Sequence, residues 1–126
     1  MRRRLAASLF ALAIGTLTPA AAAAQVVREN VPGIRNFAKV ETTVACAGAI
    51  TADAIPTIKK MGYAAIVNLR LATEEGANVP EHTAAAKAAG ITYFHIPFSA
   101  ANPDPAAVDQ FLKVMTTPGV APAFIH

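Results

Sequence analysis

The sequence lacks the residues that several classes of site require. Cys46 is its single cysteine, so no internal disulfide can form, and tryptophan is absent. The three histidines, His82, His95 and His126, are scattered along the chain, and none belongs to a Cys/His cluster with the spacing of a structural zinc site. We therefore expect no metal site, and nothing in the sequence implies a cofactor.

An excess of charge of one sign is also missing from most of the chain. The formal net charge is +3, but three arginines at positions 2–4 supply this excess, and residues 25–126 are formally neutral. Binding to nucleic acid through its phosphates requires a basic face. We therefore expect no nucleic-acid partner.

Residues 1–24 have the three parts of a secretory signal peptide. The arginines are followed by an apolar run from Leu5 to Leu17, and the small residues 22–24 precede Gln25. A helix that spans a bilayer needs roughly 20 apolar residues, which is more than this run supplies. We expect cleavage near Ala24, export to the periplasm or beyond, and no stable membrane span afterwards. The alternative is an N-terminal membrane anchor.

Strands and helices alternate in the rest of the sequence. Residues 25–36 are polar and are expected to form a linker or arm, and residues 37–126 to form one domain. We predict a hairpin at a sheet edge over 37–40 and 44–47, helices over 51–61, 80–89 and from 105 onward, and strands over 64–69, 91–96 and 121–125. The strands 64–69 and 91–96 are nearly all apolar, which is typical of strands buried on both faces. This order predicts an α/β fold with a parallel-rich sheet and flanking helices.

Two local patterns give more detail. Asp104-Pro105 has the form of a helix N-cap followed by the first helical residue. Val108, Phe111, Leu112 and Met115 then have the spacing of a buried helical stripe. Cys46, in the predicted hairpin, is expected to be a small buried apolar residue.

Five short motifs appear in a specific order. They are Gly48-Ala49-Ile50-Thr51, then Ile66-Val67-Asn68-Leu69-Arg70 followed by Glu74-Glu75-Gly76, then His95-Ile96-Pro97-Phe98, Asn102-Pro103-Asp104-Pro105, and Ala123-Phe124-Ile125-His126. In this order the chain resembles cysteine-dependent dual-specificity and tyrosine phosphatases. Within this group the chain most resembles the bacterial phosphatase-like domain found in beta-lactamase-hydrolase-like proteins and beside NAD kinase domains. The resemblance covers roughly residues 34–126.

The resemblance implies a phosphatase fold and a mechanism. In that family the last strand leads into a loop of the form His-Cys, five residues, then Arg, whose amides and guanidinium bind a phosphate group. The cysteine thiolate attacks phosphorus and forms a covalent intermediate, so that a phosphomonoester is hydrolysed. His126 takes the position of the loop histidine, and the sequence given ends one residue before the cysteine. The resemblance therefore covers an N-terminal part, C-terminally incomplete, which we expect to be inactive alone.

The resemblance also suggests residues that surround the substrate. Ala100 stands where many of these enzymes carry the acid that protonates the leaving group, and Asp104 is the nearest carboxylate. Asp104 is therefore either a shifted general acid or only the helix cap. Arg70, at the end of a predicted strand, either faces an anion or pairs with Glu74 or Glu75.

Three further residues lie near the same predicted strand ends, where ligands bind in open α/β sheets. Ser99 and Asn102 either donate hydrogen bonds to a substrate or are ordinary turn residues. His95 is expected to be a packed, hydrogen-bonded residue rather than a catalyst.

Two other functions stay open at this stage. A rhodanese-like sulfurtransferase fragment would also place a reactive cysteine after a parallel strand, but its loop length and arginine position differ. A non-catalytic α/β binding module would keep the sheet without the chemistry. The residues encoded after His126 would separate these readings. The expected substrate is a phosphorylated compound whose identity the sequence leaves open.

Overall fold

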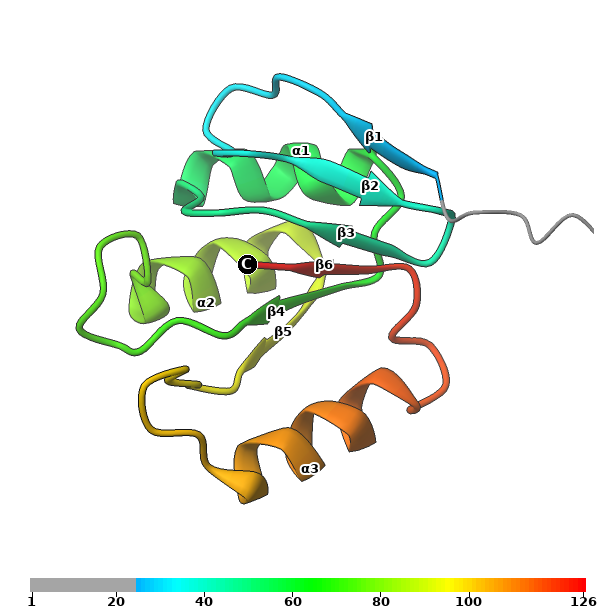
Figure 1. Ribbon diagram of the computed structural model, residues 1–126. Coiled ribbons are helices and arrows are strands. Elements are labelled where there is room, and N and C mark those ends of the chain that lie inside the picture. The colour runs from blue at the N-terminus through cyan, green and yellow to red at the C-terminus, as the bar shows by residue number, and fades with distance from the viewer. Residues whose placement is uncertain (1–24) are drawn as a thin grey trace, which may run out of the picture.

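A six-stranded mixed sheet runs through residues 25–126, the part of the chain that the computed structural model describes (Figure 1). In spatial order its strands are β1 (Val26–Arg28), β2 (Ala38–Val40), β3 (Val44–Cys46), β6 (Ala123–Ile125), β4 (Ala65–Asn68) and β5 (Thr92–His95). β1, β2 and β3 pair antiparallel, whereas β3, β6, β4 and β5 pair parallel. The predicted α/β fold with a parallel-rich sheet is confirmed. The expected signal peptide lies outside the described residues.

The segment 25–36, expected as a linker or arm, is part of the sheet. Val27 of β1 lies opposite Lys39 of β2, and Ile34 is buried and forms a β-bridge to Ile50. This strand was not predicted, because it is only three residues long and polar residues surround Val26 and Val27. The 37–47 hairpin forms as predicted, but β1 covers its outer strand, so the hairpin does not lie at the edge.

The helices begin and end at residues that explain their limits. A 3₁₀ turn, η1 (Ala52–Ala54), leads into α1 (Ile55–Lys60). Pro56 is tolerated in the first turn of α1, because backbone amides at that position have no hydrogen-bond acceptor within the helix. α2 (Val79–Ala89) ends at Gly90, which has the left-handed φ of 69° typical of a helix terminus. α3 (Pro105–Met115) completes the set. Within residues 25–126 no helix is both long enough and apolar enough to cross a membrane.

The connections place the helices on both faces of the sheet (Figure 1). The chain moves outward from β3 to β4 through α1 and on to β5 through α2, then returns to β6 through α3. Because β-α-β crossovers are right-handed, a return in the opposite direction puts α3 on the opposite face. Alternating side chains agree with this arrangement: Ile66 belongs to the core beneath α1 and α2, and Val67 to the core beneath α3.

Aromatic rings anchor β6 at the centre of the sheet. Phe124 stacks on Phe37 with ring centroids 5.9 Å apart, and the ring of Tyr63 meets Phe124 edge-on at 5.7 Å. Phe37 and Phe124 are both buried. These contacts fix the strand that immediately precedes His126.

Two predictions of burial, one for β5 and one for α3, differ from the structure. β5 is an edge strand with only partly buried side chains, so its apolar sequence overstated its burial. In α3, Val108 and Leu112 are 44% and 55% exposed, whereas Ala107 is buried. α3 packs through Ala107, Phe111, Val114 and Met115 onto β4, β5 and β6, and this rotates the buried stripe away from the predicted one.

Cys46 is also exposed rather than buried. It lies opposite Ile125 in the β3–β6 pair, on the face of the sheet that α3 covers. The side chains of α3 pack on the strands from β6 to β5 and do not extend over β3. The expectation of a buried apolar cysteine was therefore wrong.

Candidate functional site

The carboxyl ends of β4, β5 and β6 meet at a crevice. The loop after β4 leads to α2 on one face, and the loop after β5 leads to α3 on the other, so the two loops diverge. The pocket between them has a volume of about 340 Å³ and is lined by Leu69, Arg70, Glu74, Phe98, Ser99, Ala100 and His126. Three of the predicted site residues, Arg70, Ser99 and His126, therefore lie together.

His126 is fixed at the centre of this crevice. Its amide donates to the carbonyl oxygen of Val67 at 3.0 Å, and its own carbonyl oxygen accepts from the Leu69 amide at 2.7 Å. The backbone therefore stays paired with the β4 segment through its last residue. The residue is 6% exposed, and its ring lies against those of His82 and Phe124.

The environment of His126 keeps its ring uncharged. Burial lowers the pKa of His126 to about 3, and repulsion from His82, Arg70 and His95 acts in the same direction. A neutral imidazole has one nitrogen that donates and one that accepts. At neutral pH His126 can therefore orient a neighbouring loop through a hydrogen bond but brings no positive charge to an anion.

A buried amide, Asn68, holds the loop after β4. Its Nδ2 group donates to the carbonyl oxygen of Ala77 at 2.9 Å and to the hydroxyl of Tyr93 at 2.8 Å, and its Oδ1 accepts from the Arg70 amide at 2.9 Å. The sequence showed Asn68 only as part of an Asn-Leu-Arg motif. Its position at the end of a continuous apolar strand was the signal that this amide is buried and structural.

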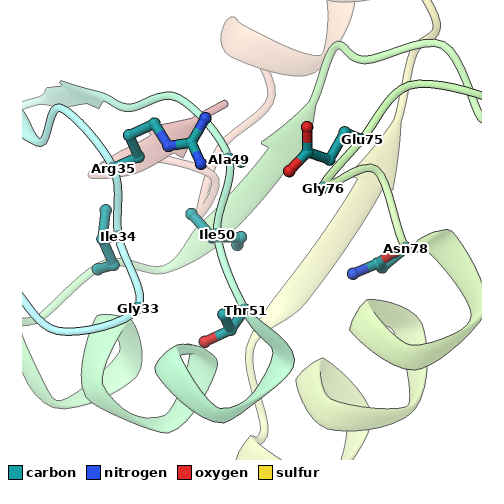
Figure 2. A pocket seen from close by; sticks show the side chains of 9 residues that line it. All are labelled: Gly33, Ile34, Arg35, Ala49, Ile50, Thr51, Glu75, Gly76 and Asn78. Carbon is teal, nitrogen blue, oxygen red and sulfur yellow. The ribbon is translucent and has the colours of Figure 1, made fainter.

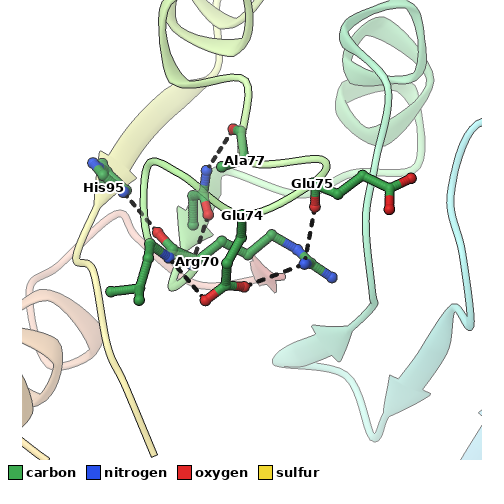
Figure 3. Close-up of polar contacts among 7 residues, drawn as sticks. Arg70, Glu74, Glu75, Ala77 and His95 are labelled. Atoms are coloured by element: carbon green, nitrogen blue, oxygen red, sulfur yellow. Dashed lines mark hydrogen bonds and ion pairs between the residues drawn. The ribbon is translucent and has the colours of Figure 1, made fainter. Parts of the chain in front are cut away.

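Arg70 is held by the loop that it begins (Figure 3). Its Nη1 group donates to a carboxylate oxygen of Glu74 at 3.4 Å and to the carbonyl oxygen of Glu75 at 3.1 Å. The expected pairing is thus confirmed, while the side chain stays 25% exposed and also lines the pocket. His95 donates from Nε2 to the Arg70 carbonyl oxygen at 2.8 Å, which confirms it as a packed, hydrogen-bonded residue.

The remaining predicted residues lie on the loop before α3. Oδ1 of Asp104 accepts from the Ala106 amide at 2.9 Å, so Asp104 is the N-cap of α3, and it does not line the pocket. Asn102 is exposed, and its amide donates to the Ser99 carbonyl oxygen at 3.3 Å, as in a turn. Of this loop, Ser99 and Ala100 reach the pocket.

A second cavity, of about 580 Å³, opens between the loop after β3 and the loop before α2 (Figure 2). Arg35 and Glu75 extend toward one another from opposite sides of its opening. Gly76, at φ 78°, closes the loop so tightly that a Cβ atom there would lie 2.5 Å from that of Ala49. Two of the sequence motifs, 48–51 and 74–76, therefore touch, a contact that their spacing in the sequence did not reveal.

The described residues offer no metal centre beside these cavities. Within residues 25–126, no three side chains among His, Cys, Asp and Glu gather closely enough to hold a metal ion. The linings of both cavities contain no cysteine, and Arg70 is the cationic residue of the smaller one. Binding by the described residues alone would thus rely on Arg70, the Ser99 hydroxyl and backbone groups.

Comparison with known proteins shows similarity of structure only. No protein-family model matches the chain, and no curated protein matches it. A solved candidate phosphatase (DUF442) from Shewanella putrefaciens superposes with a TM-score of 0.67 at 21% identity, over 78% of this chain and 66% of that one. A candidate phosphatase from Neisseria meningitidis superposes with a TM-score of 0.58 at 20% identity, over 69% of this chain and 63% of that one.

A third neighbour extends the comparison to yeast. The core catalytic domain of the PP-IP phosphatase SIW14 from S. cerevisiae, solved with citrate, gives a TM-score of 0.52 at 18% identity, over 66% of this chain and 49% of that one. The chain thus spans about two thirds or less of the length of each neighbour. At these identities the likeness shows the fold, and the expected cysteine-phosphatase-like fold is confirmed.

The capping bond of Asp104 yields a first prediction. Asp104→Ala removes the side-chain acceptor for the Ala106 amide, so we expect it to lower the free energy of unfolding by about 1 kcal/mol. Asp109→Ala, which removes an exposed carboxylate from the same helix, is the control and should change stability by less than about 0.5 kcal/mol. Urea unfolding of both variants measures the difference. Equal effects would contradict the cap.

The contact between Gly76 and Ala49 yields a second prediction. Gly76→Ala adds both the strain of a left-handed φ and a clash with Ala49, whereas Gly62→Ala, at φ 96° with open space around it, adds only the strain. We expect Gly76→Ala to lower the free energy of unfolding by roughly 1–3 kcal/mol and by more than Gly62→Ala. Adding Ala49→Gly should restore part of the loss. Denaturant titration of the three variants would contradict the contact if the two glycine substitutions proved equivalent.

The buried ring of His126 yields a third prediction, for the pH dependence of stability. The unfolded chain takes up a proton on this residue near pH 6.5, but the folded chain does so only near pH 3. Stability from this group is therefore complete above pH 6.5 and is lost as the pH falls toward 3, by about 3 kcal/mol between pH 7 and 4. Urea unfolding across this range should show the loss, and His126→Phe should weaken the slope. An unchanged slope in the variant would contradict the assignment.

Proposed function

We propose that the chain is the N-terminal part of an exported cysteine-dependent phosphatase that hydrolyses a phosphomonoester. The observation that carries the proposal is the placement of His126, buried and held by backbone bonds to the β4 segment at the end of the central strand β6. A loop that followed His126 would enter the crevice at the strand ends. Two of the structural neighbours are candidate phosphatases and a third is a PP-IP phosphatase core, which supports the same function.

The proposed chemistry needs a loop after His126 with a cysteine and, six residues later, an arginine. The thiolate attacks phosphorus, so that an S–P bond forms while the bond from phosphorus to the leaving oxygen breaks. The leaving oxygen takes a proton from a general acid, and water then cleaves the S–P bond to release phosphate. Loop amides and the arginine stabilise the charge on the transferring group.

Some of the described residues line the pocket and could contact the phosphate group. Arg70 brings a positive charge to the pocket, and the hydroxyl of Ser99 can donate to a phosphate oxygen. Asp104, our candidate general acid, caps α3 and would have to leave that role to reach the pocket. The carboxylate that already lines the pocket is Glu74, which is paired with Arg70.

The chain ending at His126 should be inactive in this proposal. Loss of the nucleophile reduces turnover by about 10⁶ in a well-studied protease. Cys46 cannot replace the missing thiol, since it lies on β3 and does not line the pocket. Export is supported by the leader pattern of residues 1–24, and the mature protein would begin near Gln25.

The coding sequence beyond the His126 codon and the activity of the full-length product test the proposal. We expect a cysteine next, an arginine six residues later, and hydrolysis of p-nitrophenyl phosphate that disappears when that cysteine becomes serine. Arg70→Ala should lower kcat/KM about tenfold through loss of a charged hydrogen bond, while Arg28→Ala, on the edge strand, should not.

The other outcomes identify the alternatives. A loop of rhodanese length with sulfurtransferase activity would replace the phosphatase assignment. A stop codon directly after His126 would leave a non-catalytic α/β binding module. Either result overturns the proposal without affecting the fold.

A further inference from the structure

A second histidine lies behind His126. His82, in the first turn of α2, is fully buried at 0% exposure, and its ring centroid is 5.5 Å from that of His126 at an interplanar angle of 62°. Tyr93 packs edge-on against His82 at 6.3 Å, and Phe124 lies 6.5 Å from His126 on the other side. The two imidazoles therefore form a closed pair between α2 and the end of β6.

Among residues 25–126, no ring nitrogen of this pair makes a hydrogen bond of full geometry, although the backbone carbonyl of Ile50 faces the His82 ring and acts to raise its pKa. Buried polar groups in native proteins are almost always paired, because an unpaired one loses its hydrogen bonds to water without replacing them. Each neutral imidazole offers one donor and one acceptor. At this separation a rotation of one ring lets the N–H of one histidine meet the lone pair of the other, so each can serve as the partner of its neighbour.

We infer that His82 is a positioning residue for His126: its N–H faces the backbone carbonyl of Ile50, and its other ring nitrogen accepts from the N–H of His126 and so fixes the tautomer and orientation of that ring. His126 then carries a lone pair on its opposite nitrogen. This inference rests on the proposed function for its consequence, because a lone pair there can accept from an amide of a loop that follows His126, whereas an N–H cannot. His82 itself touches neither the substrate nor the reacting atoms.

The charges around the pair favour a bond between two neutral rings. Burial lowers the pKa of His82, and burial with repulsion from His82, Arg70 and His95 lowers that of His126. The groups that face the pair are Arg70 after β4, His95 and Tyr93 on β5, and Glu81 on α2. Tyr93 is already bonded to Asn68, and Glu81 is exposed. Neither ring therefore has a buried carboxylate to stabilise a positive charge.

Nitrogen NMR of the full-length product, labelled with ¹⁵N-histidine, measures the bond directly. We expect His126 to show a single tautomer and its ring nitrogen to show a scalar coupling across the hydrogen bond to His82. Absence of this coupling, with both histidines as mixtures of tautomers, would overturn the inference. This measurement needs no variant and no activity.

Two substitutions separate positioning from simple packing. His82→Phe fills the space without an acceptor, so His126 should become a mixture of tautomers and its pKa should rise as a neighbouring repulsion is lost. His82→Gln keeps an acceptor and should restore the single tautomer. Lys87→Gln, on the exposed side of the same helix, is the control. An unchanged tautomer in a folded His82→Phe protein would contradict the inference, and if that variant does not fold, the wild-type coupling decides.

The activity of the same variants links the pair to the proposed function. In the full-length product His82→Phe should lower kcat about tenfold with little change in KM, and His82→Gln should recover most of the loss. A change in KM alone would contradict positioning through His126. If no variant, including the wild type, hydrolyses an aryl phosphate, the proposed function fails, while the nitrogen coupling still decides whether His82 positions His126.

Discussion

The insertion of β6 between β3 and β4 is the constraint on which the site depends. β6 is the last strand in the chain but lies between two earlier strands, so it is paired on both sides and its side chains reach both cores. The return from the sheet edge forces α3 onto the face opposite α1 and α2. The loops after β4 and β5 must then diverge, and the crevice that they leave lies at the end of β6. Topology alone therefore brings His126 beside Arg70 and Ser99.

Hydrogen bonds hold the loop after β4 that forms one side of this crevice. Asn68 makes three hydrogen bonds from a fully buried position, and one of them fixes the amide of Arg70. His95 fixes the carbonyl oxygen of the same residue. Each bond contributes about 1 kcal/mol net, but a partner left unpaired in the interior costs more, so the bonds act together. The loop after β4 is thereby held in place before any ligand is present.

Local signals in the sequence predicted the helices and strands, whereas the burial of individual side chains depends on contacts between residues that are distant in the sequence. Gly90, which follows the predicted helix 80–89, and Asp104-Pro105 mark helix limits through backbone chemistry that needs no neighbour, and both limits were predicted correctly. Which residues are buried depends on what covers them, and so the exposure of Cys46 and Leu112 was missed. His82 sits in an alanine-rich helix whose weak periodicity gave no sign that this residue faces His126.

The charges in the pocket predict that the described residues alone would bind a dianion weakly. Arg70 is already paired with Glu74 and with the carbonyl oxygen of Glu75, and the ring of His126 is neutral. An incoming phosphate would have to compete with Glu74 for the guanidinium, and it would meet the negative charge of that carboxylate. Net attraction for phosphate must therefore come from groups that add donors without adding acids. In the proposed function, backbone amides and a second guanidinium in a loop after His126 would meet that requirement.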